Sequence, residues 1–330
     1  MKEYLNKYNK TGILLINLGS PDEPDAKHVK KYLKQFLSDK RVIEANRFIW
    51  SIILNGIILP IRSSKTAALY KTVWMQDINK SPLVHYTEQQ SIKLNNQFDD
   101  NVFVDYAMRY GNPSIESKIN HLQDNGVTNI IILPMYPQYS STTIATVYDE
   151  IYRILLNKRW QPNILGIKPY YDNDQYITLL FNSIKNHLSK IDFKPDVILT
   201  SFHGIPQMYF DKGDPYYCHC HKTFRLLQEK VKQELDIDVR LCFQSRFGPK
   251  KWLQPYTSDV LEACVKENKK QVVVIAPGFP ADCLETLEEI KEREKETFIE
   301  KGGEKFSFVP CLNADKDHVS FLKNLVEKHI

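Results

Sequence analysis

The sequence has little that would carry it across a membrane. Its longest apolar run, residues 48–61, is well short of the roughly 20 residues that a spanning helix needs. Asn55 and Gly56 interrupt the run, and Pro60 is expected to stop it. The opening MKEYLNKYNK also lacks the apolar stretch of a secretory signal. We therefore expect a cytoplasmic protein in which residues 48–61 form a buried core helix, lie peripherally on the inner membrane or face an apolar ligand.

Other absences exclude whole classes of function. The net charge of +4 is mild and no basic run is interleaved with aromatic residues, so no nucleic-acid partner is expected. No G-x-G-x-x-G opens a helix, and neither G-x-x-x-x-G-K-[ST] nor G-x-S-x-G occurs, which disfavours nucleotide-dependent and acyl-transfer chemistry. Without a signal peptide, the few cysteines are expected to be reduced thiols. They are Cys218, Cys220, Cys242, Cys264, Cys283 and Cys311.

Short apolar runs alternate with longer amphipathic stretches along the whole chain. Continuous apolar runs of this kind are typical of parallel strands that are covered on both faces. They fall at residues 12–17, 102–108, 129–135, 196–202, 239–244 and 271–277. The pattern predicts an α/β protein with two similar doubly wound, Rossmann-like halves, an N-terminal lobe at residues 1–165 and a C-terminal lobe at residues 166–330.

Two of the intervening stretches carry readable helix signals. Val29, Leu33, Phe36 and Leu37 form one apolar stripe after the acidic start SPDEPD. In NPSIESKINHLQDNG, Ser114 is a candidate cap and Gly126 lies past the helix end. Both stretches are predicted to be crossover helices.

Polar residues gather in the segments that follow the predicted strands. NLGSP, MRYGNP and PMYPQYSSTT occur in the first half, and SFHGIP, QSRFGP and APGFPADCLE in the second. Ligands of open parallel sheets bind beyond the carboxyl ends of the strands. These loops are therefore predicted to line the active cleft.

His203 and a glutamate row are the strongest chemical candidates. His203 ends a predicted strand and is held by Gly204 and Pro206, where a neutral imidazole accepts a proton or binds a borderline metal. If an α-helix starts near Asp282, then Glu285, Glu289 and Glu292 form one acidic stripe, while Leu284 and Leu287 face the core. A core histidine and a solvated helix face are the structural alternatives.

The motifs SFHGIP, GDPYYCHC, FQSRFGPKKWLQPYT and PGFPADCLETLEEI resemble those of the ferrochelatase family, as do GILLINLGSPDEP, RYGNPS and LPMYPQYSSTT in the first half. The resemblance implies an enzyme, a lyase, that inserts Fe²⁺ into protoporphyrin IX to give protohaem, the last step of haem biosynthesis. It implies that His203 and Glu285 bind the incoming Fe²⁺ and remove pyrrole protons, with Glu289 and Glu292 as a path for protons or metal.

The resemblance also implies which residues surround the porphyrin. These are Arg109, Tyr136, Gln244, Ser245, Arg246, Trp252 and Phe279, with Arg62, Ser81 and the segment around residues 48–60 forming the lip above it. We expect no required cofactor, since iron is a substrate. We also expect no [2Fe–2S] cluster, because no cysteine follows Cys311 and Ser141 stands where animal members have a ligand cysteine. An alternative interpretation of the CHCH stretch at residues 218–221 is that it binds a metal.

Three alternatives stay open. The first is a chelatase that acts on coproporphyrin, or on another tetrapyrrole and metal; the apolar lip favours the less charged protoporphyrin. From another class, the protein is a non-catalytic porphyrin or haem carrier, which would need His203 but not Glu285. A two-lobed periplasmic-type binding protein is disfavoured by the missing signal.

Overall fold

The computed structural model describes residues 10–330, which divide into two compact units. Unit 1 comprises the described residues through Tyr136 together with Ser141–Lys168 and Ala314–Ile330, and unit 2 comprises Pro137–Ser140 and Pro169–Asn313. The predicted boundary after residue 165 lies close to Lys168, where the chain passes from unit 1 to unit 2. The C-terminal segment, however, belongs to unit 1. There the C-terminal helix packs against α5, and Lys93 Nζ donates a hydrogen bond to the Ala314 carbonyl at 2.6 Å.

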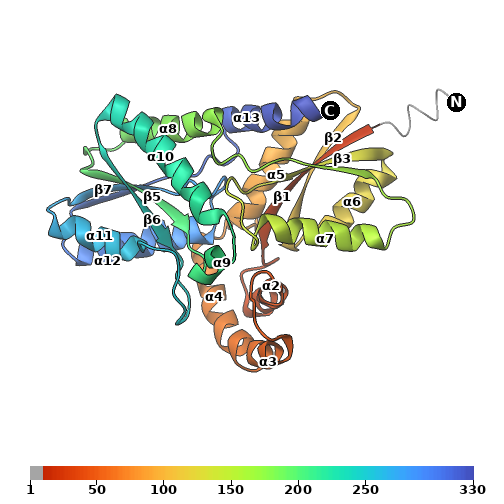
Figure 1. Cartoon of the computed structure of the whole chain (residues 1–330), viewed down its shortest axis with the longest axis horizontal. Coiled ribbons are helices and arrows are strands. Elements are labelled where there is room, and N and C mark those ends of the chain that lie inside the picture. Colours follow the sequence, from red (N-terminus) through yellow and green to blue (C-terminus); the bar gives the residue numbers. More distant parts are fainter. Residues whose placement is uncertain (1–9) are drawn as a thin grey trace. The chain divides into compact units, whose positions relative to one another are not determined.

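Unit 1 contains a four-stranded parallel sheet in the order β2-β1-β3-β4. Its strands are β1 (Lys10–Ser20), β2 (Val102–Gly111), β3 (Val127–Pro134) and β4 (Asn163–Gly166). Its helices are α2 (Ala26–Leu37), α3 (Arg47–Ile53), η1 (Leu54–Ile58), α4 (Leu59–Val73), α5 (Pro82–Asn95), α6 (Ile115–Asp124), α7 (Ile144–Leu156), α13 (Lys316–Val326) and η3 (Glu327–His329). Buried side chains of β1 and β3 pack against α6 and α7 to form the core of one face (Figure 1).

Unit 2 repeats the same strand order, β6-β5-β7-β8, in a second parallel sheet. Its strands are β5 (Val197–His203), β6 (Asp238–Gln244), β7 (Gln271–Ile275) and β8 (Lys305–Val309). Its helices are α8 (Asp174–Leu188), α9 (Gln207–Asp211), α10 (Tyr216–Leu235), α11 (Thr257–Lys266), η2 (Glu285–Glu294) and α12 (Lys295–Glu300). Figure 1 shows α8 and α10 on one face of this sheet and α11 and α12 on the other.

The predicted fold class is confirmed, because all six predicted strands form and helices cover both faces of each sheet. Strands β4 and β8 were not predicted, because they are edge strands that are only partly buried and so lack a continuous apolar run. Ser114 caps α6 by accepting a hydrogen bond from the Ser117 N–H, and Gly126 follows the helix with a φ of +84°. Both helix signals therefore act as predicted.

The segment at residues 48–61 is helical but not a buried core helix. Large apolar side chains of α3, η1 and α4 are exposed, for example Phe48 at 76% and Ile52 at 60%. A π-helical turn, η1, lies where Asn55 and Gly56 were expected to interrupt the run. Pro60 does not stop the helix: it is the second residue of α4, which continues from η1 without a break.

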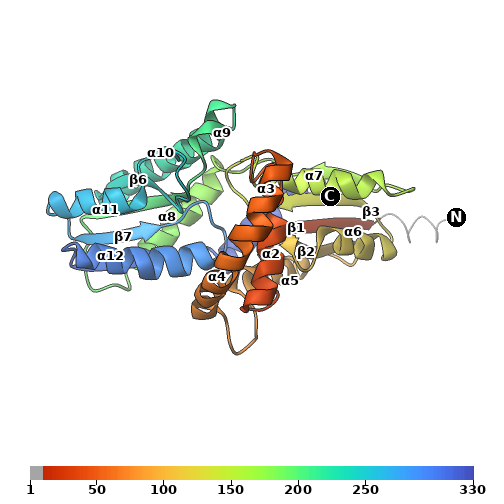
Figure 2. The same cartoon turned by 90° about the horizontal axis from the view of Figure 1, so that it is seen from below.

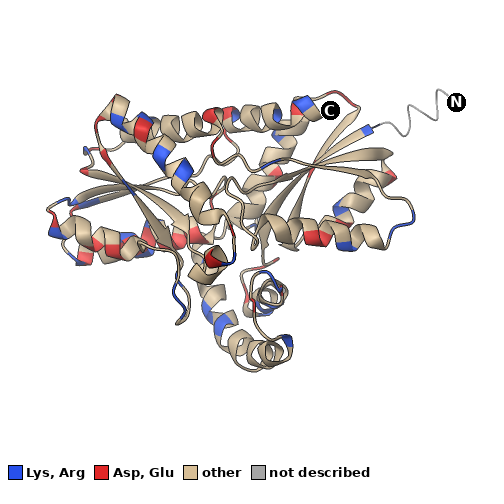
Figure 3. Ribbon diagram, viewed as in Figure 1, with Lys and Arg blue, Asp and Glu red and all other residues tan. Residues whose placement is uncertain are grey.

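The helical segment at residues 47–73, which contains most of the predicted lip and is called the lip from here on, carries positive charge and no negative charge. Its charged residues are Arg47, Arg62, Lys65 and Lys71, and it contains no Asp or Glu (Figure 3). Figure 2 shows α4 lying beside α2, which anchors it in unit 1. Among residues 10–330, no helix is long and apolar enough to cross a membrane.

Candidate active site

His203 is the last residue of β5, and its ring orientation is fixed by the turn that follows. Its Nδ1 lies 2.6 Å from the Gly204 carbonyl oxygen. Because a carbonyl oxygen only accepts, Nδ1 carries the proton and a neutral His203 presents its lone pair on Nε2. The turn is close-packed: a Cβ on Gly204 would lie 2.9 Å from the Gln244 carbonyl oxygen and 3.2 Å from the Trp252 ring. The glycine is required by this close approach.

Two aromatic rings flank the imidazole. The ring centroids of Trp252 and Phe279 lie 6.4 and 6.5 Å from that of His203. The Trp252 Nε1 is buried and has no hydrogen-bond partner among residues 10–330. His203 therefore lies half-buried between apolar surfaces at the end of its strand, as its sequence neighbours predicted.

Gln244 connects β5 to the acidic helix η2. It lies opposite His203 in the parallel register of β5 and β6. Its side chain accepts a hydrogen bond from Ser201 Oγ at 2.9 Å and donates one to the Glu285 carbonyl at 2.9 Å. In this strand order the direction of winding reverses between β5 and β7; His203 is the last residue of β5, and Glu285 begins η2, the helix after β7. The predicted His/Glu pair therefore lies at the position in the sheet where ligands bind.

The acidic segment is a π-helix, so its faces differ from the α-helical prediction. With i→i+5 hydrogen bonds, the buried residues of η2 are Thr286, Glu289 and Ile290. Leu284 and Leu287, predicted to face the core, are only half-buried, and Glu292 is exposed. Glu292 therefore does not share the buried side of η2 with Glu289. A π-helix in a functional site is a recurrent feature of proteins.

Glu289 is bound by Ser245, the first residue after β6. The Ser245 backbone N–H donates to Glu289 Oε1 at 2.8 Å, and its hydroxyl donates to Oε2 at 2.5 Å. Ser245 has a φ of +67°, an uncommon conformation for a non-glycine residue. This strained residue presents both donors to one carboxylate.

Burial raises the pKa of two further carboxyl groups of η2 and of the Cys283 thiol that precedes this helix. Desolvation raises the pKa of Glu288, and it raises the pKa of Glu294 to about 7, with nearby Glu289 adding to the shift. Burial also raises the pKa of the Cys283 thiol well above its usual range, and its hydrogen bond with Glu285 adds to this shift. A neutral Cys283 thiol therefore accompanies the Glu285 side chain.

The CHCH stretch is spread over different environments in α10. Cys218 is exposed, whereas Cys220 is buried. His219 stacks on Tyr171 with ring centroids 3.7 Å apart and accepts a hydrogen bond from the Tyr139 N–H. Within residues 10–330, no three His, Cys, Asp or Glu side chains are grouped so as to hold a metal ion.

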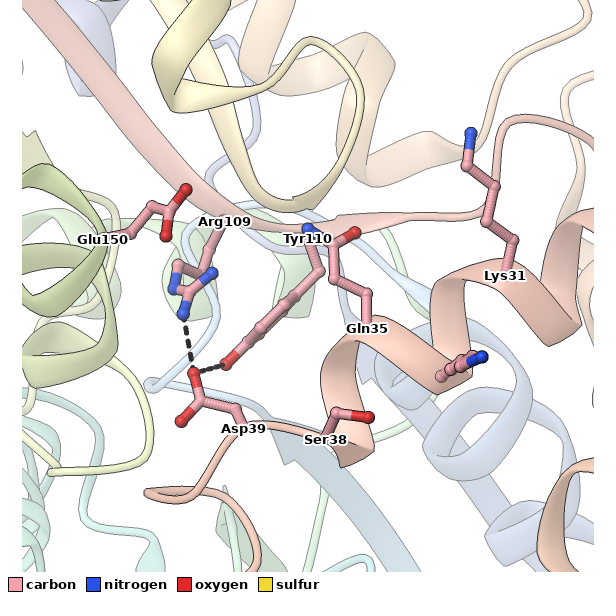
Figure 4. A pocket seen from close by; sticks show the side chains of 8 residues that line it. Lys31, Gln35, Ser38, Asp39, Arg109, Tyr110 and Glu150 are labelled. Carbon is pink, nitrogen blue, oxygen red and sulfur yellow. Dashed lines mark hydrogen bonds and ion pairs between the residues drawn. The ribbon is translucent and has the colours of Figure 1, made fainter. Parts of the chain in front are cut away.

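Arg109, in unit 1, is already partnered. Its Nη2 lies 2.6 Å from Asp39 Oδ2 and its Nε donates to the Thr146 carbonyl at 2.7 Å. Figure 4 shows the Asp39 carboxylate between Arg109 and the Tyr110 hydroxyl, which donates to it at 2.9 Å. The pair lines a pocket of about 540 Å³.

The remaining predicted site residues fall into different settings. The Tyr136 hydroxyl is buried without a hydrogen-bond partner among residues 10–330, and burial raises its pKa. Arg246 is exposed and lies over the Tyr256 ring, 4.9 Å from its centroid. Ser81, predicted as part of the lip, is buried and caps α5. Three residues of these sites were not predicted, because no local motif pairs them with their partners: Asp39, Tyr110 and Glu294.

Comparisons with known proteins agree with these motifs. The ferrochelatase family model matches residues 10–330. Curated ferrochelatases of Francisella tularensis subsp. novicida (strain U112) and subsp. tularensis (strain WY96-3418) are 62% and 61% identical over 331 residues, covering 100% of this chain and 99% of each relative.

Solved structures show the same fold at low sequence identity. SirB from Bacillus subtilis with Fe³⁺ has a TM-score of 0.57 and 14% identity, covering 97% of this chain and 95% of SirB. CbiX, described as the terminal enzyme for siroheme biosynthesis in denitrifying bacteria, has a TM-score of 0.50 and 9% identity, covering 97% of this chain and 99% of CbiX.

Proposed function

Because this chain belongs to the ferrochelatase family, we propose that unit 2 inserts Fe²⁺ into protoporphyrin IX at His203 and Glu285. The family's reaction, Fe²⁺ insertion into a porphyrin, makes the chain a metal-insertion enzyme of the lyase class. The observation that carries the assignment of residues is the His203 ring itself, whose Nδ1 is committed to Gly204 so that Nε2 is the free lone pair.

Metal insertion requires the porphyrin to lose its pyrrole N–H protons and to expose nitrogen lone pairs. In our proposal, His203 Nε2 accepts a proton, and each transfer breaks an N–H bond of the substrate and forms one on the imidazole. Trp252 and Phe279 provide apolar surfaces beside the imidazole, which excludes water from the transfer. Glu285, connected to the strand ends through Gln244, contacts the arriving iron.

Iron is a substrate in this proposal, so it enters the site and leaves it with each turnover. One imidazole nitrogen and one carboxylate make an incomplete set of ligands for Fe²⁺, which leaves coordination positions for the porphyrin nitrogens. No resident cofactor and no [2Fe–2S] cluster are part of the proposal. Iron and acid-labile sulfide analysis of the purified protein tests this, and stoichiometric sulfide would contradict it.

The choice of protoporphyrin over coproporphyrin rests on the exposed apolar side chains of the lip, such as Phe48 and Ile52. A porphyrin with more carboxylates would need more free cationic side chains, and Arg109 is already paired with Asp39. Measuring kcat/KM for both porphyrins tests the preference. A higher kcat/KM for coproporphyrin would leave the chelatase function intact but assign the other substrate.

Haem formation distinguishes an enzyme from a carrier. Purified protein is mixed anaerobically with protoporphyrin and Fe²⁺, and the visible spectrum is followed with a protein-free control. We expect haem to form much faster with the protein. A shifted porphyrin spectrum without metallation would instead indicate a carrier, for which the row of carboxylates on η2 has no use.

We further propose that the lip contacts a membrane surface peripherally from the cytoplasmic side. Phe48, Ile52 and Ile57 are more than half exposed, and the flanking charges are all basic. Co-sedimentation with vesicles tests the contact: binding should be stronger with anionic than with neutral lipid and should fall in Phe48→Ser/Ile52→Ser. Equal sedimentation of parent and variant would contradict it. The cytoplasmic location itself stays a prediction.

A further inference from the structure

Unit 2 carries a pocket along α10 that the proposed reaction does not use. Its volume is about 520 Å³, which is within the usual range for pockets that bind small molecules. The residues that line it include Tyr217, Cys218, His221, Lys222, Phe224 and Arg225. None of the residues predicted to bind the porphyrin or the iron lines this pocket. It is therefore built from other side chains than the proposed insertion site.

Cys218 and His221 bring two ligating side chains to this pocket. They are three residues apart on α10 and so lie on the same side of the helix. Cys218 is the only exposed cysteine among residues 10–330, and the His221 Nε2 is buried without a hydrogen-bond partner in that range. Burial lowers the pKa of His221, so its imidazole is neutral at pH 7. A thiol and a neutral imidazole are side chains that bind transition metals.

Two ligands are too few to hold a bare metal ion. Structural zinc sites use four protein ligands, and no third His, Cys, Asp or Glu completes such a group in the described part of the chain. The iron of haem already has the nitrogen ligands of its porphyrin, so the protein supplies only axial ligands, for which cysteine and histidine are common. The pocket therefore suits a metal held in a porphyrin better than a free ion.

The aromatic wall of the pocket is held by the core of unit 2. The Tyr217 ring is stacked with Phe243 of β6, with centroids 6.0 Å apart and an interplanar angle of 20°. Its centroid also lies 4.2 Å from that of His221. Tyr217 and Phe224 both pack against the buried cluster that includes Phe243. Rigid aromatic side chains bind large apolar ligands at a low cost in conformational entropy, so this wall suits a porphyrin.

The charged residues that line the pocket are basic. Lys222 forms no ion pair within residues 10–330. Arg225 pairs with Glu229 at 3.1 Å, but both side chains are about half exposed, where such a pair contributes little. None of the described Asp or Glu residues lines the pocket. Lys222 and Arg225 are therefore available to bind the propionate groups of a porphyrin.

We propose that the pocket along α10 binds one molecule of haem, with the Cys218 thiolate as an axial ligand of the iron and with Lys222 and Arg225 bound to the propionates. Binding forms an Fe–S bond, releases the thiol proton to water and displaces a water ligand from the iron, which keeps its oxidation state. The choice of haem rests on the proposed function, because haem is the product of that reaction. Unit 2 thus binds its product at a second place, which does not include His203.

The test titrates the full chain with ferric haem and follows the absorption and electron paramagnetic resonance spectra, which distinguish a thiolate ligand from an imidazole. His203→Ala is the background, because it removes the histidine of the proposed insertion site. We expect one thiolate-bound haem per chain in this background. Adding Cys218→Ser and His221→Gln, which removes both ligating side chains of the pocket, should abolish the thiolate spectrum. A thiolate spectrum that survives these changes, or none in His203→Ala, would overturn the proposal.

The basic residues are tested with Lys222→Ala/Arg225→Ala. We expect haem to bind about tenfold more weakly, because charge-assisted hydrogen bonds to the propionates are lost, while the thiolate spectrum stays. Lys232→Ala changes an exposed lysine of α10 outside the pocket and should leave the affinity unchanged. Equal affinities in the double variant and Lys232→Ala would overturn the placement of the propionates.

Metal-free protoporphyrin separates axial ligation from stacking of the ring. It has the same ring and propionates but no iron, so at equal concentration it should not displace haem from Cys218. Displacement would overturn ligation by this residue. Because these titrations need no turnover, a failed chelatase assay would overturn the proposed function alone, whereas a missing thiolate spectrum would overturn this site alone.

Discussion

The two units share one strand order but end their strands in different chemistry. In unit 1, the Arg109 guanidinium is paired with Asp39, and the Tyr110 hydroxyl completes the cluster. In unit 2, His203 keeps a free nitrogen, and η2 presents carboxyl groups with unequal surroundings. The two sheets provide the same mount, but the side chains near their carboxyl ends differ: unit 1 has a cation that is already paired, and unit 2 has an imidazole with a free nitrogen.

Removing the imidazole that we propose as the base in unit 2 should have the largest effect. His203→Ala is expected to slow haem formation by about 10³-fold, the range for a positioned base, while porphyrin binding is retained. Anaerobic single-turnover kinetics measures the rate, and porphyrin fluorescence measures binding. His187→Gln, at a histidine of α8 bonded to Ser307, is the matched control and should keep the parental rate.

Breaking the Asp39–Arg109–Tyr110 cluster of unit 1 should lower the stability of the fold. Asp39→Asn leaves the Arg109 charge only about a tenth exposed without its partner, and we expect a loss of about 3 kcal/mol in the free energy of unfolding. Urea denaturation measures it. The double variant Asp39→Asn/Arg109→Leu should recover part of the loss, and a double variant as unstable as the sum of both single changes would contradict a coupled pair.

The pH dependence of stability tests the surroundings of Glu294. A carboxyl group whose pKa is raised from 4.5 to about 7 on folding stabilises the protein when protonated, and that contribution is lost as the pH rises towards 7. Glu294→Gln should therefore be more stable than the parent at pH 8 by about 2 kcal/mol, with the difference shrinking towards pH 5. A difference independent of pH, measured by denaturation, would contradict the raised pKa.

The smallest expected effect concerns the hydrogen bonds that hold Glu289. Ser245→Ala removes the hydroxyl donor and keeps the backbone N–H, so a loss of about 1 kcal/mol in stability is expected. Haem formation should slow severalfold. Ser245→Gly is the control, since it also lacks the hydroxyl but tolerates the positive φ; if both variants match the parent, the hydroxyl has no role.

Much of the fold could be predicted because parallel strands covered on both faces leave continuous apolar runs. The edge strands β4 and β8 lacked that signal. The position of His203 at the end of β5 was predictable, because the apolar run stops at a histidine held by glycine and proline; its role stays a prediction. The register of η2 was not, because the prediction assumed α-helical spacing, whereas the π-helix buries Thr286 and Ile290. Asp39 was missed because its partner Arg109 is distant in sequence.

The most direct test of the central claim is single-turnover insertion of Fe²⁺ into pre-bound protoporphyrin by the parent and His203→Ala side by side, with a pH-sensitive dye reporting released protons. We predict that the parent forms haem and releases protons together, whereas the variant binds the porphyrin and does neither on that timescale. Haem formation by His203→Ala at the parental rate would contradict the claim that the end of β5 supplies the base.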